Sequence, residues 1–159
     1  VGAAARRPVG IQKVELPVPK SVLVHPGDPD LVEEGRLLHV AVPAGTGRSA
    51  IHVLIFYGFS GTRSGAAVPK EANERAIRQV FQYAAAPEGV PMLAAGDWNH
   101  GPERSPAMEE ALHLGWKDLA MEQARKDGLA QPEPTFVTDS GSSRIDHIFA
   151  NREAAAAFK

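Results

Sequence analysis

The sequence predicts an α/β domain, and three consecutive features of its middle section carry that prediction. Residues 50–57 form an apolar, β-branched run that is typical of a strand. Apolar positions at helical spacing follow over residues 71–86, and Pro87 and Gly89 end this helix. A second apolar run of strand length then covers residues 90–95. The order strand, helix, strand favours an α/β architecture.

Length and composition are those of a single globular domain over residues 1–159. Cysteine is absent, which excludes disulfides, thiol catalysis and cysteine-ligated zinc, and fits an intracellular location, cytoplasmic or nuclear. The formal charge of −2 excludes a basic coat for nucleic acid, so any phosphate recognition has to be local. No apolar run approaches the ~20 residues of a membrane span, and no membrane partner is expected.

The remaining elements follow from local patterns. We expect strands over residues 9–16, 21–25, 35–42, 135–138 and 144–150, helices over 105–115, 119–126 and 152–159, and a tight turn over 139–143. Ser105 and Pro106 make a good helix start, because serine caps the helix and proline fits its first position. A glycine-rich connection of hairpin type over residues 43–48 joins two of the strands. His39 and His52 lie inside these strands and are expected to be packed or edge residues rather than ligands.

The stretch that ends the 90–95 strand concentrates polar chemistry. Gly96 stops the apolar run, and Asp97 and Asn99 follow with Trp98 between them. Strand alternation turns Trp98 away from its neighbours, so Trp98 should anchor the loop in the core while Asp97 and Asn99 face one site. Ligands of α/β folds bind at such carboxyl edges of strands. The alternative is an Asx-turn, in which the Asp97 side chain bonds the backbone two residues on.

Four motifs now follow one another along the chain. They are the strand end at Tyr57, the Gly96–Asn99 turn, the Gly115–Asp118 segment, and Pro134–Phe136 followed by Ser143–Ile148. In this order and spacing they resemble the endonuclease/exonuclease/phosphatase superfamily, the DNase I-like fold, from about residue 35 to 151. The resemblance implies a four-layer α/β/β/α sandwich of two packed mixed sheets, of which this chain is the central to C-terminal portion. The Tyr57–Gly61 loop is most similar to the retroelement and apurinic-site endonuclease branches, which carry a tyrosine there.

The resemblance also implies a reaction: metal-dependent phosphodiester hydrolysis by an endonuclease acting on nucleic acid, with DNA as substrate and Mg²⁺ or Mn²⁺ as cofactor. Such hydrolysis needs a water aimed in line at phosphorus and compensation of charge on the phosphoryl oxygens. By resemblance, Asp97 orients or deprotonates that water, and Asn99 holds a non-bridging oxygen. Tyr57 donates a hydrogen bond to the phosphate.

Asp146 is the fourth candidate site residue. By resemblance it matches the carboxylate that orients a catalytic histidine. The alternative is a structural carboxylate bonded to Arg144 or to a nearby backbone group. His147 is adjacent in sequence and should therefore point to the opposite face of the strand, so we expect it to be structural.

Two family features have no counterpart in the sequence. The family places an asparagine and a metal-binding glutamate on earlier strands, and it ends with a Ser-Asp-His motif beyond the final strand, whereas this chain ends at Lys159. Glu71 and Glu74 are not substitutes, because they lie on or beside a surface helix. We therefore expect an excerpt of a longer enzyme that shows little or no nuclease activity alone. The alternatives are an inactive fragment or binding module of the same fold, and a phosphatase of the same superfamily, which the Tyr57 loop disfavours.

Overall fold

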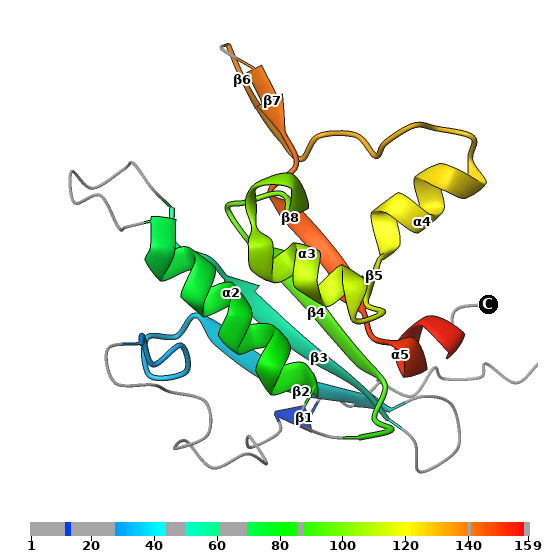
Figure 1. The fold of residues 1–159 in the computed structure, drawn as a ribbon. Coiled ribbons are helices and arrows are strands. Elements are labelled where there is room, and N and C mark those ends of the chain that lie inside the picture. The colour runs from blue at the N-terminus through cyan, green and yellow to red at the C-terminus, as the bar shows by residue number, and fades with distance from the viewer. Residues whose placement is uncertain are drawn as a thin grey trace, which may run out of the picture.

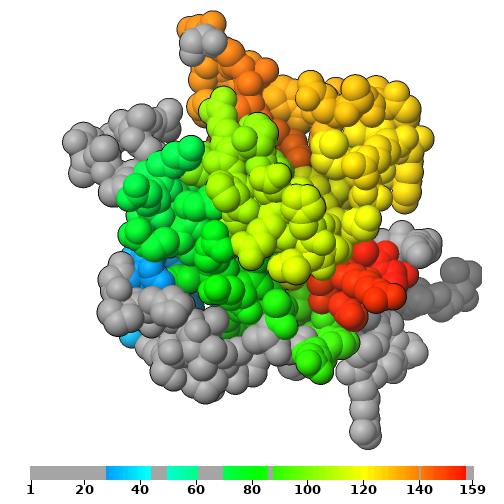
Figure 2. All heavy atoms as spheres, viewed as in Figure 1, coloured from blue at the N-terminus to red at the C-terminus, as the bar shows by residue number. Residues whose placement is uncertain are grey.

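A computed structural model describes residues 12–13, 28–43, 50–60, 70–85, 88–139 and 141–157 (Figures 1 and 2). Its elements are β1 (Gln12–Lys13), β2 (Leu37–Pro43), β3 (Ala50–Tyr57), α2 (Lys70–Ala85), β4 (Met92–Asp97), η1 (Pro102–Arg104), α3 (Pro106–His113), β5 (Lys117–Asp118), α4 (Leu119–Lys126), β6 (Phe136–Thr138), β7 (Gly141–Ser143), β8 (Asp146–Ala150) and α5 (Arg152–Ala157). Within the described ranges, no helix is long and apolar enough to span a membrane.

The central sheet is mixed, with six strands in the order β1-β2-β3-β4-β8-β5. β3 and β4 run parallel and are joined through α2, while β2 and β8 are antiparallel to their neighbours in the sheet. Figure 1 shows α2 and α3 crossing one face of this sheet. The predicted α/β class is confirmed. The four-layer sandwich is not seen in the described residues, which hold this sheet and a separate two-stranded ribbon of β6 and β7.

The core lies between the sheet and the helices, and Trp98 is at its centre. The Trp98 ring is fully buried and lies 5.0 to 5.3 Å, centroid to centroid, from the rings of Phe56, Phe81 and Phe149. Its indole N–H donates to the His147 carbonyl at 3.1 Å. Aromatic pairs of this kind add about 0.5–1.5 kcal/mol each beyond the apolar area they bury. The prediction that Trp98 anchors the loop in the core is confirmed.

The opposite face of the sheet has no such cover from the described helices. Leu38, Ile55 and Ile148 are 40%, 45% and 46% exposed there. The strand register places Leu38 opposite Ile55, and Ala95 between Ile55 and Ile148. These four residues form one apolar row across β2, β3, β4 and β8. A second sheet packed on this face would bury the row, because inner faces of packed sheets interdigitate.

Helix starts follow their capping residues. Ser105 Oγ accepts the Met108 amide at 3.3 Å, and Pro106 takes the first position of α3, as predicted. Asp118 caps α4 by accepting two backbone amides at 3.1 and 3.2 Å, a role that the sequence analysis did not anticipate.

Two predictions of local structure need correction or lie outside the description. The tight turn predicted over residues 139–143 is wrong in part, because Gly141–Ser143 pairs with β6 as β7. Small, exposed residues pair here because the ladder uses backbone groups, which every non-proline residue carries. Of the strand predicted over 9–16, β1 (Gln12–Lys13) is described. The strand predicted over 21–25 and the connection after Pro43 lie outside the described residues.

His39 and His52 bond each other on the helix-covered face. His39 Nε2 lies 2.9 Å from His52 Nδ1, and the Tyr83 hydroxyl lies 3.3 Å from His39 Nδ1. Burial, helped by the neighbouring His52, lowers the pKa of His39 to about 4. A neutral His39 can donate from one ring nitrogen and accept at the other, so it can bond both Tyr83 and His52. The prediction that His39 is a packed residue is confirmed.

Candidate functional site

The strand register brings three of the predicted site residues into one row. Tyr57 on β3 is the cross-strand partner of Asp97 on β4, and Asp97 is the partner of Asp146 on β8. These residues alternate in phase with Ile55 and Ile148, so the row lies on the uncovered face of the sheet. The register thus places Asp97 beside both Tyr57 and Asp146. Their catalytic roles stay predictions.

Asp97 combines the two interpretations of its motif. Its Oδ1 accepts the Asn99 amide at 3.0 Å, which is the Asx-turn of the alternative. Burial raises the pKa of the Asp97 carboxyl, the Asn99 amide opposes this, and the charge of Asp146 adds to the rise. A carboxylate with a raised pKa is a stronger base near neutral pH. The turn therefore holds one oxygen while the carboxylate keeps chemistry suited to proton transfer.

Asn99 ties the Asp97 loop to the Tyr57 loop. It adopts a positive φ of 55°, and its Nδ2 donates to the Gly58 carbonyl at 3.1 Å. The Gly58 amide in turn donates to the Asp97 carbonyl at 2.7 Å. One of the two side-chain N–H groups of Asn99 is thus used within the protein, and among the described residues the other has no acceptor, so it can donate to a ligand oxygen.

Asn73 on α2 bonds the same two loops, and nothing in the sequence singled it out. It is 2% exposed, accepts the Phe59 amide at 2.8 Å and donates to the Trp98 carbonyl at 2.9 Å. A Cβ on Gly58 would lie 2.8 Å from the Trp98 carbonyl oxygen and 2.9 Å from the Asn73 side chain, so glycine is required there. A lone asparagine near a helix start has no sequence signal that separates it from an ordinary surface residue.

Arg36 extends the row by one residue on the β2 side. Its backbone carbonyl accepts the Tyr57 amide at 2.8 Å, and its Nη1 lies 3.3 Å from the carbonyl oxygens of Tyr57 and Gly58. The guanidinium carbon also lies 3.9 Å from the centre of the Phe59 ring. Its Nε also donates to Glu34 Oε2 at 3.2 Å, so the guanidinium against the loop that carries Tyr57 is part of an ion pair. Nothing in the sequence singled Arg36 out.

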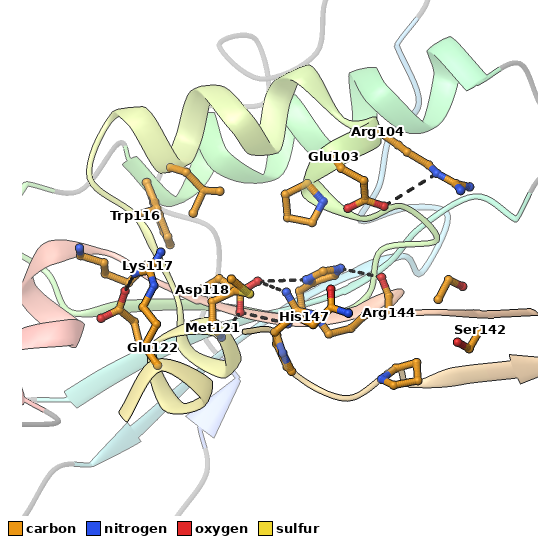
Figure 3. A pocket seen from close by; sticks show the side chains of 17 residues that line it. Glu103, Arg104, Trp116, Lys117, Asp118, Met121, Glu122, Ser142, Arg144 and His147 are labelled. Carbon is orange, nitrogen blue, oxygen red and sulfur yellow. Dashed lines mark hydrogen bonds and ion pairs between the residues drawn. The ribbon is translucent and has the colours of Figure 1, made fainter. Parts of the chain in front are cut away.

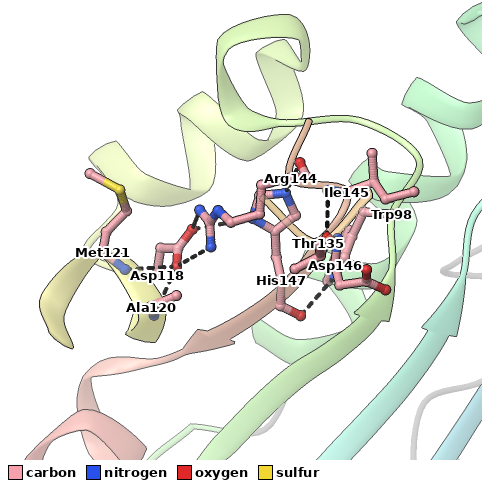
Figure 4. A network of polar contacts seen from close by, with 9 residues as sticks. All are labelled: Trp98, Asp118, Ala120, Met121, Thr135, Arg144, Ile145, Asp146 and His147. Carbon is pink, nitrogen blue, oxygen red and sulfur yellow. Dashed lines mark hydrogen bonds and ion pairs between the residues drawn. The ribbon is translucent and has the colours of Figure 1, made fainter. Parts of the chain in front are cut away.

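The segment around Asp146 is held by its neighbours (Figure 4). Arg144 Nη1 donates to Asp118 Oδ1 at 3.1 Å, and Arg144 Nη2 contacts Asp118 Oδ2. The alternative in which Arg144 holds Asp146 is therefore wrong, because its guanidinium is turned to Asp118. The His147 side chain is fully buried on the opposite face from Asp146, as predicted, and its Nδ1 lies 3.2 Å from Asp118 Oδ2.

The electrostatics of Asp118 follow from these contacts. Burial alone would raise the pKa of the Asp118 carboxyl, but hydrogen bonds from His147 and Arg144 outweigh it and hold that pKa well below its usual range. Asp118 is therefore a permanent carboxylate. A carboxyl with such a low pKa is typical of a structural ion pair rather than of a group that gains and loses a proton during catalysis.

A pocket of about 730 Å³ opens beside this network (Figure 3). Trp116 and Lys117 lie on one side of it, Glu103 and Arg104 on another, and Asp118 with its bonding partners at its base. None of the row residues lines it. The pocket is therefore separate from the row of Tyr57, Asp97 and Asp146.

The metal site implied by the resemblance is incomplete in this part of the chain. The described residues contain no group of three or more His, Cys, Asp or Glu side chains placed to hold a metal ion. The Glu74 carboxylate accepts the Ser105 hydroxyl at 2.7 Å and the Ala107 amide at 2.5 Å.

Comparisons with known proteins show which family and which solved structures this chain is similar to. The model of the Endonuclease/Exonuclease/phosphatase family matches residues 6–159. The AP endonuclease LMAP from Leishmania major has a TM-score of 0.58 at 14% identity, over 93% of this chain and 54% of that one. A humanized D. rerio TDP2 has a TM-score of 0.53 at 23% identity, over 72% and 44%. No curated protein sequence matches. The structural likeness shows the fold, and the chain spans about half the length of these structures.

Proposed function

We propose that this chain, which belongs to the Endonuclease/Exonuclease/phosphatase family, supplies the water-activating part of a phosphodiesterase site that acts on nucleic acid. The observation that carries the proposal is the register that aligns Tyr57, Asp97 and Asp146 on one uncovered sheet face. An isolated Asx-turn would not require two further polar residues at the same level of neighbouring strands.

In this proposal Asp97, Tyr57 and Asn99 have different roles in hydrolysis. Asp97 takes a proton from a water as the water oxygen forms a bond to phosphorus. The bond from phosphorus to the leaving oxygen breaks, and this oxygen keeps the electron pair and takes a proton from solvent. The raised pKa of the Asp97 carboxyl suits it to that transfer. Tyr57, which is 53% exposed, donates its hydroxyl to a phosphoryl oxygen, and the second N–H of Asn99 donates to another.

We further propose Mg²⁺ or Mn²⁺ as the cofactor, from family membership. Such an ion, when bound, polarises phosphoryl oxygens. The described residues do not complete its site, so no step is derived through it. The second sheet of the DNase I-like sandwich belongs to the same proposal, and the apolar row from Leu38 to Ile148 is the surface that it would cover.

DNA is the proposed substrate, and two features support a polyanion. The Tyr57 loop is similar to that of the endonuclease branches, and the cation of Arg36 lies against this loop. Recognition of this kind is local, as a chain with a formal charge of −2 requires.

The test measures Mg²⁺-dependent nicking of a plasmid by the longest protein that carries this chain, beside Asp97→Ala and an exposed control, Glu110→Gln. The proposal expects nicking that Asp97→Ala loses and Glu110→Gln keeps. Binding of DNA without cleavage would contradict it in favour of the inactive module. Release of phosphate from inositol phosphates without nicking would contradict it in favour of the phosphatase. The 159-residue chain alone is expected to nick little or not at all.

A further inference from the structure

We propose that Asp118 and Thr135 are positioning residues for Asp146. Together they fix the segment over residues 144–147, and this segment sets the Asp146 carboxylate opposite Asp97. The inference rests on the proposed function, in which Asp97 works beside Asp146.

The backbone of the segment is held first by Thr135. The Thr135 hydroxyl oxygen accepts two consecutive amides, those of Ile145 and Asp146, both at 3.1 Å. Thr135 lies just before β6, and its own amide donates to the Ser143 carbonyl at 3.1 Å. One hydroxyl thus fixes the two peptide units that precede the Asp146 side chain. A valine of the same shape would leave both amides without this acceptor.

The Asp97 loop holds the same segment from the other side. The Trp98 amide donates to the Ile145 carbonyl at 2.8 Å, and the Trp98 indole donates to the His147 carbonyl at 3.1 Å. Trp98 directly follows Asp97 in the chain. The contacts therefore connect the backbone beside one carboxylate to the backbone on both sides of the other.

The side chains that flank Asp146 converge on Asp118 at the start of α4. Arg144 meets both carboxylate oxygens of Asp118, and His147 Nδ1 lies 3.2 Å from one of them. The second ring nitrogen of His147 lies 3.1 Å from the Arg144 carbonyl oxygen. The Asp118 and His147 side chains are 3% and 0% exposed, so the contacts are shielded from water. A shielded, bidentate ion pair has well-defined geometry.

The Asp146 carboxylate itself takes no part in these contacts. Figure 4 shows Arg144 and His147 turned toward Asp118, and Asp146 turned away from it. Within the described ranges, its carboxylate oxygens accept no hydrogen bond, although its backbone amide is bonded. The register places this carboxylate opposite Asp97. The arrangement orients Asp146 and leaves its charge available.

The charge of Asp146 gives a readout that does not depend on catalysis. Burial raises the pKa of the Asp97 carboxyl, and the negative charge of Asp146 raises it further, while the Asn99 amide lowers it. Moving Asp146 away therefore lowers the pKa of Asp97. An Asp146→Asn variant removes the same charge without moving the backbone, and its Asp97 pKa defines the full effect.

The experiment is a carbon-detected NMR titration of the Asp97 carboxyl in the 159-residue chain. Asp118→Asn and Thr135→Val should lower the pKa of Asp97 toward its value in Asp146→Asn. Thr135→Ser keeps the hydroxyl and should restore the wild-type pKa. Glu122→Gln is the matched control, because Glu122 is a carboxylate on the same helix that pairs with the exposed Arg125 at 2.7 Å.

An Asp97 pKa that stays at the wild-type value in Thr135→Val would overturn the inference. This variant decides the matter if Asp118→Asn fails to fold, because Thr135 is exposed. An Asp146→Asn variant with an unchanged Asp97 pKa would also overturn it. If the pKa falls as expected but no phosphodiester is cleaved by the longer protein, the positioning role stands and the proposed function fails.

Discussion

On the helix-covered face of β3, Leu54 and Phe56 are at most 1% exposed. On the other face of the same strand, Ile55 and Tyr57 are 45% and 53% exposed. The covered face is filled by aromatic packing around Trp98, whereas the uncovered face carries the row with Asp97. Because successive side chains of β3 point to opposite faces of the sheet, one strand contributes to both the core and the proposed site. Substitutions on the covered face should therefore change stability, and substitutions on the uncovered face should change activity.

The largest effect should come from the covered face. Trp98→Ala removes a fully buried ring with three aromatic neighbours, and should lower the free energy of unfolding by about 3–5 kcal/mol. Tyr57→Phe removes a half-exposed hydroxyl and should change it by less than about 0.5 kcal/mol. Urea denaturation of both variants measures this. Equal losses of unfolding free energy in the two variants would show that the two faces contribute equally to stability.

Gly58 follows Tyr57 and lies against the backbone of the buried Trp98. Gly58→Ala forces a Cβ within 2.8 Å of the Trp98 carbonyl, and should cost about 1–3 kcal/mol while displacing the Tyr57 loop. Gly101→Ala is the control, because its nearest atoms belong to the exposed, flexible Glu103 side chain. Thermal melts compare the two, and a Gly58→Ala variant as stable as the wild type would contradict the close approach.

Acid should weaken the covered face through His39. Its pKa is lowered from 6.5 to about 4, so between these values the unfolded chain binds a proton that the folded chain does not. Stability due to His39 is therefore complete above pH 6.5 and is lost as the pH falls toward 4, by about 1–2 kcal/mol after allowance for screening. His39→Gln should flatten this part of the curve of unfolding free energy against pH. A curve with the wild-type slope would show that other groups cause it.

The smallest effect is expected on the apolar row. Ile148→Ser changes a residue that is 46% exposed, and should alter the unfolding free energy of the 159-residue chain by less than about 1 kcal/mol. In a longer protein whose second sheet covers the row, the same change should cost about 2 kcal/mol or more. Equal costs in both proteins would argue against a second sheet on this face.

Much of this division was predictable from the sequence. The apolar runs over residues 50–57 and 90–95 and the helix between them are local signals, and together they indicate a strand, a helix and a strand. Two parallel strands bring their carboxyl ends to the same edge of a sheet, which is where Tyr57 and Asp97 lie. The side to which Trp98 points followed from alternation alone.

The contacts that hold the site were not predictable, because they join residues far apart in the chain. Asp118 and Arg144 are separated by 26 residues. Both lie in segments that resemble the family, but nothing in the sequence indicates that their side chains pair. Asn73 and Arg36 were missed for the same reason. Strand alternation did indicate that His147 is turned away from Asp146, but not that it meets Asp118.

The most direct test of the central claim is the kinetics of Asp97→Asn in the longest protein that carries this chain. The substitution removes the charge and keeps the shape, so kcat for plasmid nicking should fall by a factor on the order of 10²–10⁴ while Tm stays near the wild-type value. Glu110→Gln, on the exposed pair with Arg78, should leave both quantities unchanged. A wild-type kcat in Asp97→Asn would contradict the claim that the row on the uncovered face is catalytic.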